Sequence, residues 1–233
     1  MYKRMYAFLK KHDILYELQF GFRAKHSTTQ ALISITEKIR SALDSGNVTC
    51  GIFIDLQKAF DTVDHMLLLQ KLEHYGIRDN ANKWFKSYLT NRKQFVSING
   101  FQSDEALMQF GVPQGSILGT ILFLLYINDL NNASRFCTTR LFADDTCLLI
   151  KNKNLKQLKK HLNLDLRNVC NWLKANKISL NSSKTEMLLF RHHNKVINYN
   201  LKIKIDGKKL LPSDFVKYLG LYIRSFPKME PPH

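Results

Sequence analysis

The stretch "LFADDTCLLI", residues 141–150, places two adjacent carboxylates, Asp144 and Asp145, inside an otherwise apolar run. The short apolar arms on either side predict a tight strand-turn-strand unit. Neighbouring residues of a strand point to opposite faces, so both carboxylates can reach one site only at a turn. Ionised carboxylates this close raise each other's pKa, which is unfavourable unless cations bind them. The pair favours a metal site, although a hairpin turn with two solvated acids explains it equally well alone.

A third carboxylate follows another predicted strand. The apolar, β-branched run "VTCGIFIDL" is typical of a buried strand, and Asp55 lies at its end. Hard Mg²⁺ binds oxygen ligands, and two such ions can activate one oxygen and stabilise another in phosphoryl transfer. Asp61 and Asp64 compete for the role of Asp55, but both are explained as caps of the helix that follows. The predicted site holds two Mg²⁺ ions, or Mn²⁺ in their place, on Asp55, Asp144 and Asp145.

The rest of the chain alternates predicted helices and strands. Ser27 and Gln30 form an S-x-x-Q capping box at the start of a helix, and Asn99 with Gly100 matches a type I′ hairpin turn. Apolar residues at helical spacing predict an amphipathic helix over 154–174, with strands after it. This order predicts an α+β fold with a mostly antiparallel sheet. We expect helices on one face of that sheet and an open second face that accepts a duplex.

The composition indicates a polyanionic partner. The 233 residues include 35 Lys and Arg against 19 Asp and Glu, a formal net charge of +16. Such an excess favours nucleic acid as the partner. Residues 151–209 carry most of it and are the expected electrostatic footprint, although any one lysine there is equally explained as part of a solvated helix face.

Other sequence features exclude several classes of protein. The four cysteines have no C-x-x-C spacing, so neither a zinc site nor a disulfide framework is expected. The N-terminus lacks a signal peptide, and the longest apolar run, residues 117–127, is shorter than the roughly 20 residues that span a bilayer. We therefore expect an intracellular, soluble chain without a membrane partner.

Six segments occur in the order seen in reverse transcriptases of non-LTR (LINE-type, jockey-like) retrotransposons. They are "QFGFRAKHSTTQAL", "FIDLQKAFDTVDH", "GVPQGSILGTILFLLYINDL", "LFADDTCLLI", "SLNSSKTEMLLF" and "KYLGLYI". The chain resembles that reverse transcriptase domain over residues 15–223. The resemblance implies a right-hand polymerase core with fingers (1–47 and 77–110), a palm (48–76 and 111–223) and an unstructured tail (224–233). Family members continue into a thumb, so the chain resembles a truncated domain with the thumb absent.

The resemblance also implies roles for individual residues. Asp55, Asp144 and Asp145 match the palm carboxylates. Lys184 matches a lysine that protonates departing pyrophosphate, and Phe60 matches the aromatic ring that excludes a 2′-hydroxyl. The dNTP is further bound by Arg23 and Lys25, beside a helix N-terminus, and by Gln114 and Gly115, while Leu219 and Gly220 support the primer end. Without the resemblance, each of these residues has an ordinary explanation as a core, turn or solvated residue.

The implied reaction is that of an RNA-directed DNA polymerase, a nucleotidyltransferase that adds dNTPs to a DNA primer on an RNA template. Two departures are small: Phe142 replaces a common tyrosine, and Thr120 replaces a common proline. The missing thumb favours the alternative of a non-catalytic relic that only binds nucleic acid or divalent metal. A group II intron maturase shares the palm chemistry but is less similar around Asp55. No sequence pattern indicates the oligomeric state.

Overall fold

The computed structural model describes residues 1–192 and 201–225, which form two compact units. The first unit comprises Met1–Tyr16, Lys58–Asp129 and Ala175–Ile178. The second comprises Glu17–Gln57, Leu130–Lys174 and the described residues from Ser179 onward. Each unit is therefore assembled from segments that are distant in the sequence.

The second unit is built on a four-stranded sheet in the order β10 (Glu186–Phe190), β1 (Val48–Ile54), β8 (Asp145–Asn152) and β7 (Thr138–Phe142). All three neighbouring pairs are antiparallel, as the sequence predicted. The helix α2 (Thr28–Asp44) begins at the predicted capping box, in which the Ser27 hydroxyl accepts from the Gln30 N–H and the Gln30 side chain accepts from the Ser27 N–H.

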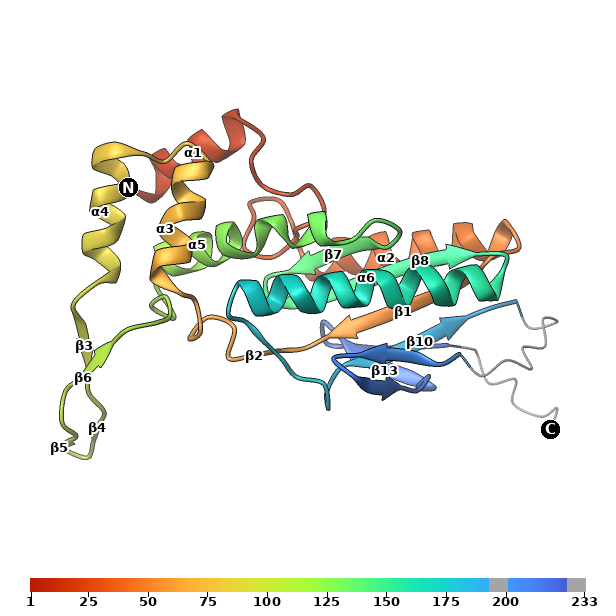
Figure 1. Cartoon of the computed structure of the whole chain (residues 1–233). Coiled ribbons are helices and arrows are strands. Elements are labelled where there is room, and N and C mark those ends of the chain that lie inside the picture. Colours follow the sequence, from red (N-terminus) through yellow and green to blue (C-terminus); the bar gives the residue numbers. More distant parts are fainter. Residues whose placement is uncertain (193–200, 226–233) are drawn as a thin grey trace. The chain divides into compact units, whose positions relative to one another are not determined.

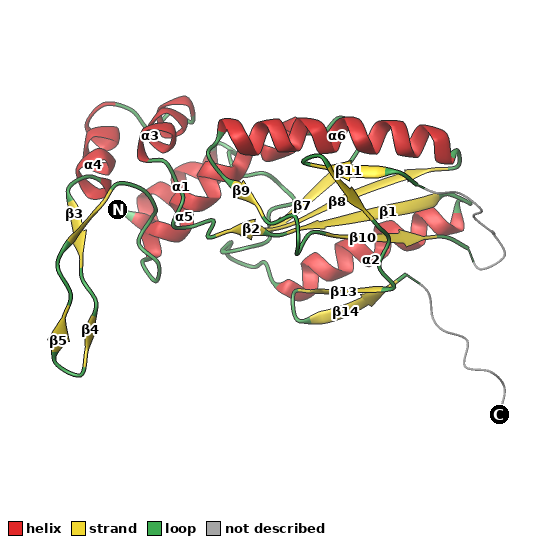
Figure 2. Cartoon of the chain, turned by 60° about the horizontal axis from the view of Figure 1, so that its bottom comes forward, coloured by secondary structure: helices red, strands yellow, loops and turns green. Residues whose placement is uncertain are grey.

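Both faces of this sheet are covered, so the expectation of one open face is wrong. Figure 2 shows α6 (Leu155–Ala175) on one side of the sheet and α2 on the other. On the α2 side, Ile35 and Ile39 pack in one cluster with Phe53 of β1. Every residue of β1 is buried, as in strands enclosed on both faces. In the described part of the chain, this sheet therefore leaves no bare face for a duplex.

Shorter elements complete the second unit. The hairpin of β13 (Phe215–Tyr218) and β14 (Leu221–Arg224) packs on the α2 side, through Val216 and Tyr218. A second hairpin joins β11 (Ile203–Ile205) to β12 (Lys208–Leu210), and β2 (Leu56–Gln57) pairs with β9 (Ser179–Leu180). The expected tail begins one residue too early, because Arg224 still pairs with Phe215. Residues 226–233 of that tail lie outside the described residues.

The first unit is a helical body with a long β-ribbon. Its helices are α1 (Tyr2–Lys11), α3 (His65–His74), α4 (Asp79–Leu89) and the almost wholly buried α5 (Ile117–Ile127), which is followed by the 3-10 turn η1 (Asn128–Ala133). The ribbon consists of β3 (Arg92–Gln94) paired with β6 (Ala106–Met108) and of β4 (Ser97–Ile98) paired with β5 (Phe101–Gln102). Asn99 and Gly100 have positive φ angles in the predicted hairpin turn. Figure 1 shows the ribbon extending from α4.

Among the described residues, no helix combines the length and the apolar character needed to cross a lipid bilayer.

Candidate active site

The two adjacent aspartates lie at the turn that joins β7 to β8. Phe142 pairs with Asp145 across the hairpin, which leaves Ala143 and Asp144 as the two turn residues. Ala143 has a φ of +54°, a left-handed conformation that reverses the chain here. Asp144 therefore lies in the turn while Asp145 begins β8. The predicted strand-turn-strand unit is confirmed, and the alternation of side chains is broken between the two acids.

The strand register brings Asp55 next to this turn. Ile54, the last residue of β1, lies opposite Thr146 of the antiparallel β8. The residue after Ile54 is Asp55, and the residue before Thr146 is Asp145, so these two acids occupy neighbouring ends of adjacent strands. The three candidate carboxylates thus gather at one end of the sheet, although Asp55 and Asp145 are 90 positions apart in the chain (145 minus 55).

The pKa values of the turn acids reflect this crowding. Loss of hydration, with the negative charge of Asp55, raises the pKa of Asp144 above its ordinary range. Asp145 reaches solvent, but the protein around its carboxyl group still removes part of its hydration. That loss, with the charges of Asp144 and Asp55, raises the pKa of Asp145 to about 6. Three acids that repel one another in this way need positive charge to remain ionised together.

This shift predicts a pH-dependent stability. Because the pKa of Asp145 is about 6 in the folded chain and roughly 3.9 when unfolded, its protonated form stabilises the fold, and that contribution is lost as pH rises through about 6. Asp145→Asn should therefore stabilise the metal-free chain at pH 8, by about 1 kcal/mol after solvent screening, and have little effect at pH 4. Urea unfolding in EDTA at pH 8 and at pH 4 measures the free energy of unfolding of the wild type and of the variant. An equal gain at both pH values would contradict the assignment.

The side chains as they stand do not form a closed metal site. Within the parts of the chain that the structure describes, no three His, Cys, Asp or Glu side chains are grouped so that they could hold a metal ion. The three aspartates share one end of the sheet and interact through their charges. Their carboxyl groups would have to rotate about the side-chain bonds to share a cation.

Asn181 links Asp55 to the turn that carries Lys184. Its side-chain amide donates to Asp55 Oδ2 at 2.7 Å, and its backbone N–H donates to the Asp55 carbonyl at 2.9 Å. The Asn181 carbonyl in turn accepts from the N–H groups of Lys184 and Thr185. The Lys184 side chain is exposed at this turn, within the same unit as the aspartates. Asn181 was not among the predicted site residues, although it lies in the segment "SLNSSKTEMLLF".

Gln19 and Gly21 fix the acid turn from outside the sheet. The buried Gln19 side chain accepts through Oε1 from the N–H of Gly21 at 2.8 Å and from that of Ala143 at 3.0 Å. A Cβ on Gly21 would lie 2.2 Å from the Ala143 nitrogen, so only glycine fits this close approach. Leu141 also exchanges backbone hydrogen bonds with Leu18 and Phe20. Gln19 and Gly21 lie in the segment "QFGFRAKHSTTQAL", but neither was a predicted site residue.

Gly21→Ala should disturb the acid turn more than the fold. The added methyl group meets backbone atoms of residues 142 and 143, which cannot yield without moving Asp144. Displacement of reacting groups by about 1 Å can reduce rates roughly 100-fold, so we expect primer extension to fall 10- to 100-fold. Gly46→Ala is the control, because Gly46 has a φ of +71° but open space around it. Unchanged extension by Gly21→Ala would contradict this role.

The candidate primer-support hairpin contacts the same turn. Leu219 and Gly220 form the turn between β13 and β14, with φ angles of +48° and +85°. The neighbouring Tyr218 is buried, stacks edge-on against Phe53 with ring centres 5.1 Å apart, and donates through its hydroxyl to the Asp145 carbonyl at 3.5 Å. Leu219 is half-buried against the core, so packing explains part of its presence.

The candidate phosphate-binding cations lie just before α2. Arg23 is half-buried and donates through Nη1 to the carbonyls of Glu17 and Gln19, so it holds its own loop together. Lys25 is exposed and has a φ of +64°. Both belong to the second unit, as do the aspartates. Of these two cations, Lys25 is the more exposed.

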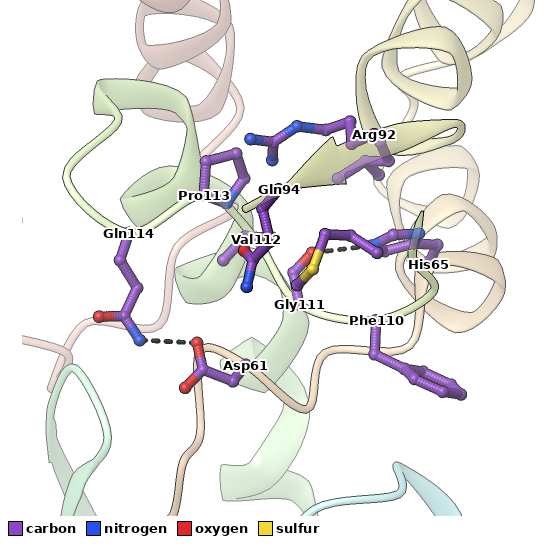
Figure 3. A pocket seen from close by; sticks show the side chains of 11 residues that line it. Asp61, His65, Arg92, Gln94, Phe110, Gly111, Val112, Pro113 and Gln114 are labelled. Atoms are coloured by element: carbon purple, nitrogen blue, oxygen red, sulfur yellow. Dashed lines mark hydrogen bonds between the residues drawn. The ribbon is translucent and has the colours of Figure 1, made fainter. Parts of the chain in front are cut away.

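The other predicted dNTP contacts belong to the first unit. The ring of Phe60 stacks on Phe123 of α5, with centres 4.1 Å apart. Gln114 donates to Asp61 Oδ1 at 2.7 Å, and Gly115 has a φ of +78°. Asp61 and Gln114 line a pocket of about 290 Å³ that also contains Arg92 (Figure 3). The expectation that Asp61 caps the helix is wrong, because α3 has Asp64 as its N-cap and the Asp61 carboxylate accepts from Gln114 instead.

Asp64 is the true cap of α3. Its Oδ1 accepts from the Leu67 N–H at 2.9 Å, and its Oδ2 pairs with Lys177 at 2.6 Å. Burial raises the pKa of Asp64, but the hydrogen bond from Lys177 and the other lowering contributions outweigh it, so the net shift is downward. The expectation that Asp64 caps a helix instead of binding metal agrees with this contact.

Solved structures of telomerases share this fold. The structure of telomerase from Candida albicans in complex with a fragment of telomeric RNA has a TM-score of 0.61 at 14% identity, and covers 95% of this chain and 36% of the telomerase chain. Apo telomerase from Candida tropicalis, truncated from its C-terminal domain, has a TM-score of 0.61 at 15% identity, covering 96% of this chain and 42% of its own. These similarities show a polymerase fold of the α+β class.

The family follows from sequence comparison. The family described as "Reverse transcriptase (RNA-dependent DNA polymerase)" matches residues 1–223, so the chain belongs to the reverse transcriptase family. The probable RNA-directed DNA polymerase from transposon BS of Drosophila melanogaster is 30% identical over 94% of this chain, and that from the mobile element jockey of the same species is 27% identical over 88%. The resemblance to non-LTR, jockey-like elements is confirmed. The chain spans about a quarter of the length of these relatives.

Proposed function

We propose that this chain provides the catalytic core of an RNA-directed DNA polymerase, adding dNTPs to a DNA primer on an RNA template inside the cell. The observation that carries the proposal is the register that sets Asp55 beside Asp145, with Asp144 in the adjoining turn. Family membership makes template-directed nucleotidyl transfer the chemistry to which this carboxylate group belongs. The fingers comprise residues 1–47 and 77–110, and the palm comprises 48–76 and 111–223.

The carboxylates suit a hard divalent cation. All three donors are oxygens, as Mg²⁺ requires, and the raised pKa values of Asp144 and Asp145 indicate negative charge without a matching partner. We propose that Asp55, Asp144 and Asp145 hold two Mg²⁺ ions, with Mn²⁺ as a substitute. When bound, such ions activate an attacking oxygen and stabilise the charge of a leaving phosphate. Asn181 orients Asp55, and Gln19 with Gly21 positions the turn.

Other residues act on the substrates. Lys25 and Arg23 lie at the N-terminus of α2, where cations and free N–H groups favour a triphosphate. Phe60 is held by its stack on Phe123 and would exclude a ribonucleotide 2′-hydroxyl, while Gln114 and Gly115 contact the base pair. Leu219 and Gly220 support the primer, and Lys184 supplies a proton to departing pyrophosphate. Exposed Lys184 has the freedom to reach that group.

Primer extension tests the proposal. The chain is incubated with a labelled DNA primer annealed to an RNA template, dNTPs and Mg²⁺, and the products are sequenced. Extension that copies the template, stops in EDTA and returns with Mg²⁺ or Mn²⁺ is the expected result. Absence of extension, with RNA binding retained, would instead identify a non-catalytic nucleic-acid-binding relic. A DNA template in place of RNA measures the template preference.

A further inference from the structure

One groove of the second unit lies along α6 and is lined by none of the residues assigned above. The apolar side chains at positions 158, 162, 166, 169 and 173 of α6 are buried. Positions 159, 163, 167, 170 and 174 form the adjacent stripe of the helix, and they line a groove of about 550 Å³ with the β11–β12 hairpin as its second wall. Figure 2 shows β11 beside α6. We call this surface the α6 groove.

The two walls are joined by defined contacts. Asn163 on α6 accepts through Oδ1 from the Lys204 N–H at 2.9 Å and donates through Nδ2 to the Lys202 carbonyl at 3.3 Å. Lys174 pairs with Asp206 in the hairpin turn at 2.8 Å. In the hairpin, Ile203 and Ile205 are buried while Lys202 and Lys204 point outward and are exposed. The groove is thus a fixed feature with cations on both walls.

The groove is strongly cationic. Its charged lining residues are Lys159, Arg167, Lys174, Lys202 and Lys204 against a single acid, Asp206, a formal net charge of +4 (five minus one). Asp206 is already paired with Lys174. Within residues 1–192 and 201–225, no ion pair involves Lys159, Arg167, Lys202 or Lys204. Four cations therefore face one groove without a neutralising carboxylate.

We infer that the α6 groove binds the phosphodiester backbone of a nucleic acid strand, at a site separate from the three aspartates. From Lys159 to Lys174 the helix rises about 22 Å, which is long enough to lie against several successive phosphates of one strand. Among the described residues, the lining offers cations and the amide of Asn171 but no aromatic ring for base stacking. Recognition is therefore of phosphate and independent of sequence. The choice of nucleic acid rests on the proposed function, but the binding requires neither metal nor catalysis.

Charge neutralisation at matched positions tests this inference. The groove variant carries Lys159→Gln, Arg167→Gln and Lys204→Gln. The control carries Lys153→Gln, Lys156→Gln and Lys160→Gln, which removes the same charge from exposed lysines on or just before α6 that do not line the groove. Binding to a fluorescent 20-nucleotide RNA, and to DNA of the same sequence, is followed by anisotropy in EDTA over a range of salt concentrations. Thermal unfolding verifies that both variants fold.

The groove variant should lower the slope of log affinity against log salt by about two, because three contacts contribute roughly 0.7 each on a single strand. The control should retain the wild-type slope. A similar loss with RNA and DNA identifies the phosphodiester backbone, and a larger loss with RNA identifies RNA as the strand bound. The inference would be overturned if the groove variant kept the wild-type salt slope, or if the control lost as much slope as the groove variant. Because the assay contains EDTA, failure of primer extension leaves this result unaffected.

Discussion

Asp55→Asn is expected to reduce primer extension on an RNA template by about 10³-fold or more, and Asp144→Asn with Asp145→Asn to do the same. Stabilisation of developing charge commonly contributes a factor of this order for each group removed. Asparagine keeps the size of aspartate, and its carbonyl can still accept from Asn181. The fold should therefore survive while the negative charge is lost. Extension rates at saturating dNTP measure the loss of catalysis, and thermal unfolding of each variant measures any loss of stability.

The matched control for this series is Asp214→Asn. Asp214 is an exposed acid of the same unit, and its backbone carbonyl accepts from Ser225. It should retain wild-type extension and melting temperature. If Asp55→Asn behaves like Asp214→Asn, Asp55 is not part of the catalytic group, and the register between β1 and β8 has no functional meaning.

Asp165→Ala is expected to destabilise the second unit by about 3–5 kcal/mol. Asp165 is fully buried in α6, and its carboxylate accepts from the N–H groups of Arg135, Phe136 and Cys137 at 3.1, 2.8 and 2.7 Å. These residues lead directly into β7, the strand that ends at the acid turn. Alanine would leave one buried and two partly buried N–H groups without an acceptor, and each unmade hydrogen bond costs about 1–3 kcal/mol.

Thermal unfolding measures this effect. For a chain of this size, 1 kcal/mol shifts the melting temperature by about 2–4 °C, so a decrease of 6 °C or more is expected. Asp165→Asn keeps one acceptor oxygen, so its melting temperature should lie between those of the wild type and of Asp165→Ala. The control Asp44→Ala removes an exposed acid at the end of α2. A melting temperature equal to that of the control would show that the carboxylate does not hold the segment before β7.

Local sequence patterns were sufficient for most elements and for the acid turn. The capping box at Ser27, the turn at Asn99 and the hairpin around Asp144 each depend on residues within a few positions of one another. The buried strand that ends before Asp55 was also predictable from its continuous apolar run. That same run has no polar alternation, which indicates a strand covered on both faces. The prediction of an open sheet face was therefore wrong, because the apolar run itself indicated that both faces are covered.

The residues that position the site were not predictable, because their partners are distant in the chain. Gln19 contacts Ala143 across 124 positions, and Asn181 contacts Asp55 across 126. Nothing local distinguishes a glutamine or asparagine with such a partner from one in solvent. Asp165 did carry a signal, since it lies on the apolar stripe of α6 among Leu162, Leu166 and Val169. A lone acid at a buried helix position implies a specific set of donors.

Asp55, Asp144 and Asp145, from the ends of two strands, are proposed to share one metal site. Iron(II) can replace Mg²⁺ at oxygen ligands and, with peroxide and ascorbate, cuts the backbone next to the bound ion. The cleavage products, mapped by mass spectrometry, should end near residue 55 and near residues 144–145, and both cuts should disappear with excess Mg²⁺ or in Asp55→Asn. Cleavage near only one of these segments, or cleavage unaffected by Asp55→Asn, would contradict a shared site.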